Sequence, residues 1–364
     1  MSRRIHRQVG QLIMAGFHGP TVPTELRAVA HEFDLGGIIL FERNVEAPEQ
    51  VAELAYDAQK MSQELPLWVS IDQEGGRVSR LKEPFTAWPP MCTLGRSGEV
   101  SLAKRFSRAL ARELLAVGVS LDYAPVLDIH TNRRNPVIGD RALSDQAHDV
   151  ARLGAAIIDG LQREGVAACG KHFPGHGDTS SDSHHELPVV DHPPERLEEV
   201  ELVPFRAAVA RDVAMIMTAH VLYPALDEEY PATLSPNVVT ELLRRELGFT
   251  GLIATEDLSM KAITADWSVE RASVTAIAAG CDVLLLCAPN IDQQVQVIEA
   301  LIRAVENEIL PAARIEDALG RQNHVKARFL SGTRVRRPLS SRKVRTVLGC
   351  DEHAEIAATM RQFV

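Results

Sequence analysis

Two neighbouring carboxylates follow a short apolar run in the C-terminal half of the chain. The stretch "IATEDLSMKA", residues 253 to 262, places Glu256 beside Asp257 directly after a segment that is typical of a buried strand. A carboxylate in such a place can serve as a nucleophile or as an acid/base group. The stretch alone leaves open whether Glu256, Asp257 or neither residue does chemistry.

The densest group of reactive side chains lies in the stretch "KHFPGHGDTSSDSHHELP", which begins at residue 171. It holds four histidines and three acids in 18 residues, and its Pro and Gly content excludes a long regular helix. Asp182 and His184 are two residues apart, so in an extended loop both side chains project to one side and can hydrogen-bond. The carboxylate would then fix the imidazole tautomer and favour its protonated form, which suits proton transfer near neutral pH. A surface pair that only stabilises the loop is the alternative.

A metal site is a second interpretation of the same loop. His176, Asp178, Asp182 and His184 are all plausible metal ligands. Their spacing, however, fits no specific zinc pattern, and clusters of carboxylate and imidazole serve acid/base chemistry equally well. We therefore expect no metal and no other cofactor.

The elements that must position these residues follow a regular alternation. Between amphipathic segments of helical periodicity, the chain carries eight short apolar runs that are typical of strands in a parallel sheet: "QLIMAGF", "LGGIILF", "LWVSID", "VSLDYAPVLDI", "GVAACGKHF", "VAMIMTAHV", "GLIATED" and "CDVLLLC". Strand and helix alternating eight times predict an α/β fold, a (β/α)8 TIM barrel. We expect one catalytic domain over residues 1–331 and a short C-terminal extension over 332–364. An open doubly wound sheet is the structural alternative.

Polar residues stand where several of these predicted strands end. They are Asp72, Asp128, Lys171, His172, His220, Glu256 and Asp257. Barrel enzymes place their active sites at the C-terminal ends of the strands, so these side chains are expected to share one site. Helix capping explains one or two acids at such positions, but not two adjacent cationic side chains together with several carboxylates.

Composition limits the partners and the compartment. The formal charge of −10 argues against a nucleic-acid surface, which needs a basic stripe. The apolar patch near the N-terminus is interrupted by Gln and Gly and lacks a cleavage site typical of signal peptides. No run approaches the roughly 18 apolar residues of a membrane helix. We therefore expect no membrane span and a cytoplasmic location.

The sequence resembles glycoside hydrolase family 3, and in particular its single-domain bacterial β-N-acetylglucosaminidases (NagZ type), which act in peptidoglycan recycling. The resemblance runs from about residue 8 to 330 and rests on seven stretches in the same order: "GGIILFERN", "SIDQEGGRVSRL", "APVLDI", "IGDRA", "KHFPGHGDTSSDSHHELP", "MTAHVLYPALDEEYPATLS" and "LRRELGFTGLIATEDLSM".

The resemblance implies a role for each matching residue. Asp182 and His184 match a loop pair in which the His, instead of a carboxylic acid, is the general acid/base. The residues that match a subsite for the terminal sugar are Asp72, Arg80, Arg141, Lys171 and His172. The implied activity is removal of terminal β-linked N-acetylglucosamine from muropeptides or related glycosides by a retaining double displacement.

One position departs from the family pattern. The nucleophilic Asp of this subgroup falls on Glu256, whose carboxylate reaches roughly a bond length further, and a misplacement of about 1 Å can cost about 10²-fold in rate. Glu256 as nucleophile, Asp257 in its place, and an impaired sugar-binding homologue therefore all stay open. A glycoside phosphorylase is a further alternative, because an imidazole acid/base repels phosphate less than a carboxylate does.

The chain after residue 332 lies outside the resemblance. "GTRVRRPLSSRKVRTVLG" is basic, and "EHAEIAATMRQFV" predicts a short helix with Ile356, Met360 and Val364 on one face. We expect a solvated extension whose final helix docks on the barrel. A contact with a partner or an anionic polymer is the alternative.

Overall fold

The eight apolar runs form eight parallel strands that close into a barrel, in a computed structural model that describes residues 3–330 and 338–364. The TIM-barrel prediction is confirmed, and the open-sheet alternative is wrong because the first strand pairs with the last, Ile13 opposite Leu284. In chain order the barrel strands are β1 (Ile13–Ala15), β2 (Gly37–Leu40), β3 (Trp68–Ile71), β6 (Leu121–Asp122), β7 (Ala167–Phe173), β8 (Met215–Thr218), β9 (Leu252–Asp257) and β10 (Val283–Leu286).

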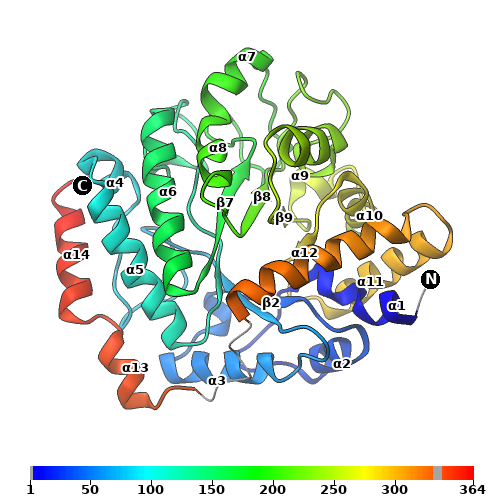
Figure 1. The fold of residues 1–364 in the computed structure, drawn as a ribbon, viewed down its shortest axis with the longest axis horizontal. Coiled ribbons are helices and arrows are strands. Elements are labelled where there is room, and N and C mark those ends of the chain that lie inside the picture. Colours follow the sequence, from blue (N-terminus) through cyan, green and yellow to red (C-terminus); the bar gives the residue numbers. More distant parts are fainter. Residues whose placement is uncertain (1–2, 331–337) are drawn as a thin grey trace.

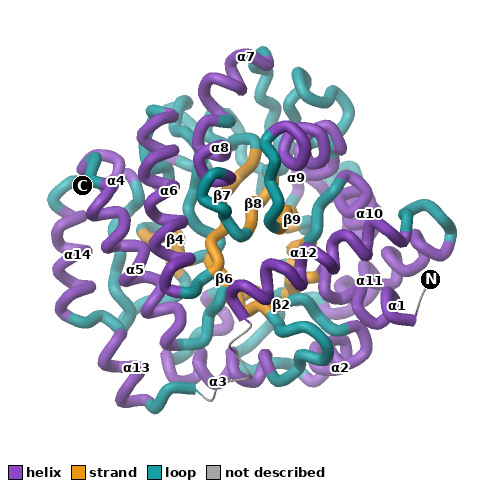
Figure 2. The backbone as a smooth tube through the Cα atoms, in the orientation of Figure 1, coloured by secondary structure: helices purple, strands orange, loops and turns teal. Residues whose placement is uncertain are grey.

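Helices surround these strands on the outside of the barrel, as Figures 1 and 2 show. The helix Asn237–Glu246 ends shortly before Gly248, whose φ of +69° is unfavourable for residues with a side chain. The longer helices are α2 (Thr24–Phe33), α3 (Pro48–Gln59), α5 (Val100–Ala116), α6 (Ala147–Glu164), α10 (Val269–Ala279), α11 (Ile291–Glu306) and α12 (Ala312–Leu330), and the shorter ones are α1 (Arg3–Gln8), α4 (Cys92–Ser97), α7 (Pro194–Arg196), α8 (Val203–Val209) and α9 (Lys261–Thr264).

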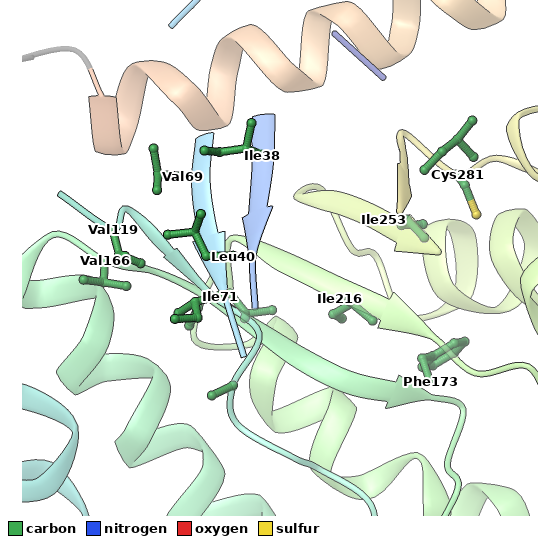
Figure 3. Close-up of a cluster of buried hydrophobic side chains, with 14 of the residues drawn as sticks. Ile38, Leu40, Val69, Ile71, Val119, Val166, Phe173, Ile216, Ile253 and Cys281 are labelled. Atoms are coloured by element: carbon green, nitrogen blue, oxygen red, sulfur yellow. The ribbon is translucent and has the colours of Figure 1, made fainter. Parts of the chain in front are cut away.

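Alternation along each strand divides the core into two layers. Ile38, Leu40, Val69 and Ile71 belong to the layer between strands and helices, part of which is drawn in Figure 3. Residues of the opposite parity, including Ile39, fill the inside of the barrel. A side chain at the end of a strand therefore faces the inside of the barrel only if it has the interior parity.

Helix α12 covers the N-terminal end of the barrel. Its Lys326 Nζ donates to Gln11 Oε1 at 2.5 Å and to the Gly36 carbonyl at 2.9 Å, and both acceptors lie just before a barrel strand. The Gln322 side chain accepts from Trp68 Nε1. Because this end is closed by α12, the opposite end is the one available to a substrate.

Two further elements lie beside the barrel. A hairpin of β4 (Gln73–Gly75) and β5 (Val78–Ser79), which the sequence interpretation missed, follows β3 directly. Helices α13 (Ser341–Val347) and α14 (Asp351–Arg361) lie along α3, α4 and α5 (Figure 1). Ile356 and Met360 are buried as predicted, but Val364 lies beyond the helix and is 78% exposed, so its predicted place in the buried face is wrong. The predicted boundary at residues 331 and 332, and the basic stretch up to residue 337, lie outside the described residues.

Candidate active site

A cavity of about 510 Å³ opens at the C-terminal ends of the strands. Most of the predicted site residues converge on it, and those that line it are Asp72, Arg80, Arg141, Lys171, His172, Asp182, His184, Glu256 and Asp257. Asp128 and His220, which were also expected at this site, are fully buried and do not line the cavity. Asp72 directly follows β3 and Arg80 directly follows β5, Arg141 lies in the segment after β6, and the other lining residues come from β7, the loop after β7 and β9. The size of the cavity is that of a typical small-molecule site.

One wall of the cavity is a network of opposite charges around Lys171. Its Nζ lies 2.7 Å from Asp72 Oδ1 and 2.6 Å from Glu74 Oε1. Arg141 binds both oxygens of Glu74, at 2.8 and 2.9 Å. Such a bidentate pair fixes the orientation of both groups as well as their separation.

The two acids of this network differ in exposure. Burial alone would raise the pKa of Glu74, but Arg141 and Lys171 lower it far below its usual value. Glu74 is 2% exposed and enclosed by these cations, whereas Asp72 is 16% exposed and lines the cavity. Asp72 can therefore accept hydrogen bonds from a ligand, while Glu74 holds the two cations in place.

Two guanidinium groups that line the cavity lie on one aromatic ring. Arg43 lies 4.4 Å and Arg80 5.5 Å from the ring centroid of Phe41. Arg80 approaches Asp72 only to 3.8 Å, and its Nε has no hydrogen-bond partner. Arg80 thus keeps donors available for a ligand.

His172 is held from behind by a buried carboxylate. Its Nδ1 lies 2.7 Å from Asp128 Oδ2, and Asp128 also accepts from the backbone N–H groups of His172 and His176. Although burial opposes ionisation, the neighbouring His172 and His176 lower the pKa of Asp128. Asp128 therefore fixes the orientation of the His172 ring, whose other edge faces the cavity.

Different contacts separate Glu256 from Asp257. Ala254 of β9 points into the barrel, but the register against β10 shifts after it, so that Asp257 lies opposite Leu285. Oε2 of Glu256 accepts from the His220 N–H at 3.3 Å, whereas Oδ1 of Asp257 accepts from the backbone N–H groups of Ser259 and Cys287, each at 3.1 Å. Because of the register shift, the period of two in the sequence could not have shown this difference.

The electrostatic surroundings of the two acids also differ. Burial raises the pKa of Asp257 despite its two N–H donors. Burial acts on Glu256 in the same direction, but His172, His220 and His176 more than offset it and lower the pKa of Glu256. Glu256 is thus held as a carboxylate, the form that a nucleophile requires.

Asp182 and His184 form the predicted pair at the mouth of the cavity. Nδ1 of His184 lies 2.7 Å from Asp182 Oδ1, and His184 is 59% exposed. The conformation differs from the prediction, because residues 182–186 form a turn in which Asp182 Oδ1 also accepts the His184 N–H. Burial would raise the pKa of Asp182, but these contacts with His184 lower it.

Buried groups fix this turn. Nε2 of His176 lies 3.0 Å from Ser183 Oγ, and the Ser183 carbonyl accepts from the Ala262 N–H in α9. The His176 ring also contacts Thr179, and Asp178 contacts His192 at 2.6 Å. These proposed metal ligands thus have other partners, and the described residues contain no cluster of three or more potential ligands that could hold a metal ion.

Sequence reasoning missed Glu74 as a member of the site. The sequence could have indicated Glu74 through its spacing from Asp72, because residues two apart in an extended segment point to the same side. Asp128 was placed at a strand end, but its contact with His172 depends on two strands coming together and has no local signal.

Comparison with known proteins identifies the family of the chain. Residues 4–325 match the family described as the glycosyl hydrolase family 3 N-terminal domain. A β-hexosaminidase of Nitrosomonas eutropha is 38% identical over 314 residues, which cover 82% of this chain and 88% of that protein. A family 3 β-N-acetylglucosaminidase from Paenibacillus has a TM-score of 0.93 and 42% identity, covering 100% of this chain and 69% of that one. NagZ from Neisseria gonorrhoeae, solved with N-trifluoroacetyl-D-glucosamine, has a TM-score of 0.79 and 30% identity over 97% of both chains.

The barrel, its carboxylate-lined cavity and these matches define a carbohydrate-cleaving enzyme, and the chain belongs to glycoside hydrolase family 3. Within that family it is a glycoside hydrolase of the NagZ type, and the curated relatives that it matches are β-hexosaminidases.

Proposed function

We propose that the enzyme removes terminal β-linked N-acetylglucosamine by double displacement, with Glu256 as nucleophile and His184 as general acid/base. The observation that carries the proposal is that a carboxylate whose pKa is lowered by its surroundings and a hydrogen-bonded Asp–His pair line the same cavity. Retaining glycosidases need these two functions on either side of the scissile bond.

The first step follows from the states of these groups. Glu256 attacks the anomeric carbon, and the glycosidic C–O bond breaks while the His184 imidazolium protonates the departing oxygen. Asp182 holds Nδ1 of the ring, which leaves Nε2 to carry this proton. In the second step neutral His184 takes a proton from water, which releases the sugar and restores Glu256.

Binding of the terminal sugar is assigned to the opposite wall. Asp72 accepts from sugar hydroxyl groups, while Lys171, Arg141, Arg80 and His172 are the surrounding donors. This assignment is supported by the partial exposure of Asp72 and by the unpaired donor of Arg80. Muropeptides are the proposed natural substrates, since the cationic rim of Arg43 and Arg80 can pair with their carboxylates.

The test is release of nitrophenol from its N-acetyl-β-glucosaminide and from its β-glucoside by the purified protein. Turnover of the N-acetyl substrate alone is expected. Folded protein that binds N-acetylglucosamine without turnover of either substrate would instead identify an impaired homologue, in which Glu256 does not replace the family's Asp.

Phosphorolysis is the second candidate, favoured by the imidazole acid/base and by Arg43, Arg77 and Arg80 along the cavity. A phosphate ion pairs well with guanidinium groups and is not repelled by a His. The same assay with and without inorganic phosphate separates the two reactions. Stimulation by phosphate, with sugar 1-phosphate as the product, would replace hydrolysis as the main activity.

The proposed compartment is the cytoplasm, in agreement with a role in peptidoglycan recycling. Among the described helices, none combines the length and apolar composition needed to cross a bilayer. Fractionation of cells that produce the protein tests the proposal, because activity in the periplasmic or culture fraction would contradict it.

A further inference from the structure

The C-terminal helix α14 is joined to the barrel through one buried carboxylate. Glu113 of α5 is buried, and its Oε1 accepts from Thr86 Oγ1 at 2.7 Å, from the Gly349 N–H at 2.8 Å and from His353 Nδ1 at 3.0 Å. These donors come from the segment after β5, the turn before α14 and α14 itself. Because a buried carboxylate is costly without such bonds, the three parts of the chain are held together.

A second set of contacts joins α14 to the same segment. The guanidinium of Arg361 donates to the Ala87 carbonyl at 2.8 Å. Trp88 packs edge-on against Phe106 of α5, with ring centroids 5.0 Å apart, and lies 6.3 Å from the ring of His353. Thr86 and Trp88 are therefore buried beside α5 and α14, while Ala87 is held by its carbonyl.

This segment in turn supports the β4–β5 hairpin. The Gly76 N–H donates to the Trp88 carbonyl at 2.9 Å. Gly75 and Gly76 have φ values of +107° and +56°, and a Cβ on Gly76 would lie 2.9 Å from Pro90 Cα. The turn of the hairpin thus fits closely on residues 88–90, so a shift of that segment must move the turn.

The hairpin turn lies between two residues that line the cavity. On one side of it, Glu74 holds Lys171 and Arg141. On the other side, Arg77 donates to the carbonyls of Val137 and Ile138, in the loop that carries Arg141. A continuous set of packed groups and hydrogen bonds therefore runs from α14 to the charged wall that faces the sugar.

We propose that α14 is a positioning element of the sugar-binding wall, with His353 and Arg361 as its positioning residues. Neither touches the substrate; both act by fixing residues 86–88, and through them the hairpin with Glu74 and Arg77. Only the expected change in KM rests on the proposed function. The mechanical link from α14 to the hairpin is independent of which sugar is bound.

The test compares full-length variants of α14. Arg361→Ala and His353→Ala remove one donor each, and Glu355→Ala and Gln362→Ala change exposed side chains of the same segment as controls. We measure kcat and KM on the nitrophenyl N-acetyl-β-glucosaminide, and hydrogen–deuterium exchange of peptides covering residues 73–81. Each donor variant is expected to raise KM about fivefold with a smaller change in kcat, the range for one lost hydrogen bond, and to speed exchange in the hairpin.

His353→Asn provides the rescue, because Asn Nδ2 can replace His Nδ1 as the donor to Glu113 and should restore most of the affinity. A fall in melting temperature with KM and hairpin exchange unchanged in both donor variants would show that α14 has only a structural role. If the His353→Ala variant does not fold, the Arg361→Ala variant alone tests the proposal. Arg361 is at the surface, so its replacement should not prevent folding. Absence of turnover in the wild type would overturn the proposed function, while the exchange result would still decide the inference.

Discussion

Nζ of Lys171 lies 2.6 Å from Oε1 of Glu74, and both side chains are only 2% exposed. Without the Glu74 charge, Lys171 keeps only Asp72 as a partner, and the largely buried Arg141 loses its carboxylate partner. Glu74→Gln is therefore expected to lower the free energy of unfolding by about 3–5 kcal/mol, as measured by urea denaturation at pH 7, and to weaken sugar binding. Asp140→Asn is the control, because its pair with Arg77 is exposed and contributes less than about 1 kcal/mol.

The same pair predicts a pH dependence. The pKa of Glu74 is lowered on folding, so its stabilisation is complete above its ordinary value of 4.5 and is lost as the pH falls towards the lower folded value. The stability difference between the wild type and Glu74→Gln should thus be constant from pH 7 to 5 and narrow in stronger acid. A difference that widens in acid would contradict the assigned direction.

The nucleophile is tested by a matched pair of variants. Glu256→Gln should lower kcat by at least about 10³-fold, because the amide cannot form the glycosyl intermediate. Asp257→Asn should mainly reduce stability, since this side chain bonds the Ser259 and Cys287 N–H groups. Mass spectrometry after trapping with a slow fluorosugar should find the label on Glu256. A label on Asp257 would reverse the assignment.

The pH profile gives an independent test of Glu256. Because its surroundings lower its pKa, the acid limb of kcat/KM should lie below pH 4.5, the ordinary value of the group. The profile of the free enzyme is measured between pH 4 and 9 with an uncharged substrate. The prediction is contradicted if the acid limb lies well above pH 5 and if the Glu256→Asp variant shifts it. Such a result would show that the Glu256 carboxylate is not held in its ionised form.

His184 is tested through the leaving group. His184→Ala should lose about 10²–10⁴-fold in activity on glycosides with poor leaving groups, which need protonation, and less than about tenfold on dinitrophenyl glycosides. His185→Ala changes the neighbouring exposed imidazole and should leave both activities near the wild-type level. Equal losses of the His184 variant on both substrates would remove its role as the acid.

Lys326 predicts a stability effect far from the cavity. Burial lowers its pKa from 10.5 to about 7. Between these values the unfolded chain holds one more proton than the native protein, so stability should rise with pH by up to about 1.4 kcal/mol per unit. The Lys326→Met variant should lack this contribution to the rise in the free energy of unfolding between pH 7 and 10. Urea denaturation at a series of pH values measures that rise. An unchanged slope would mean that Lys326 stays charged when buried.

Much of the barrel could be predicted from the sequence because parallel strands are buried on both sides and appear as continuous apolar runs. The run "CDVLLLC" gave β10, and polar residues at strand ends located the cavity. The β4–β5 hairpin was missed because its strands have only three and two residues, and the first of them consists of Gln, Glu and Gly. The turn at Asp182 was missed because nothing local distinguishes it from an extended loop.

Contacts between distant segments account for the rest. The pairing of Glu113 with His353 joins residues 240 positions apart, and neither residue stands out in the sequence. Val364 fitted the helical period of Ile356 and Met360, but the helix ends at Arg361, before the period reaches it. The roles of Glu256, Asp257, Asp182 and His184 remain predictions that the variants above test.

The different placements of Glu256 and His184 have an evolutionary consequence. His184 is 59% exposed on a turn between elements, where residues can be exchanged or inserted without disturbing the barrel. Glu256 is the penultimate residue of β9, whose residues Leu252 and Ala254 belong to the buried core inside the barrel, so an added methylene must be accommodated by the surrounding barrel. In this barrel the acid/base is therefore the group that can change type or position readily among descendants, whereas a change of nucleophile requires compensating changes around it.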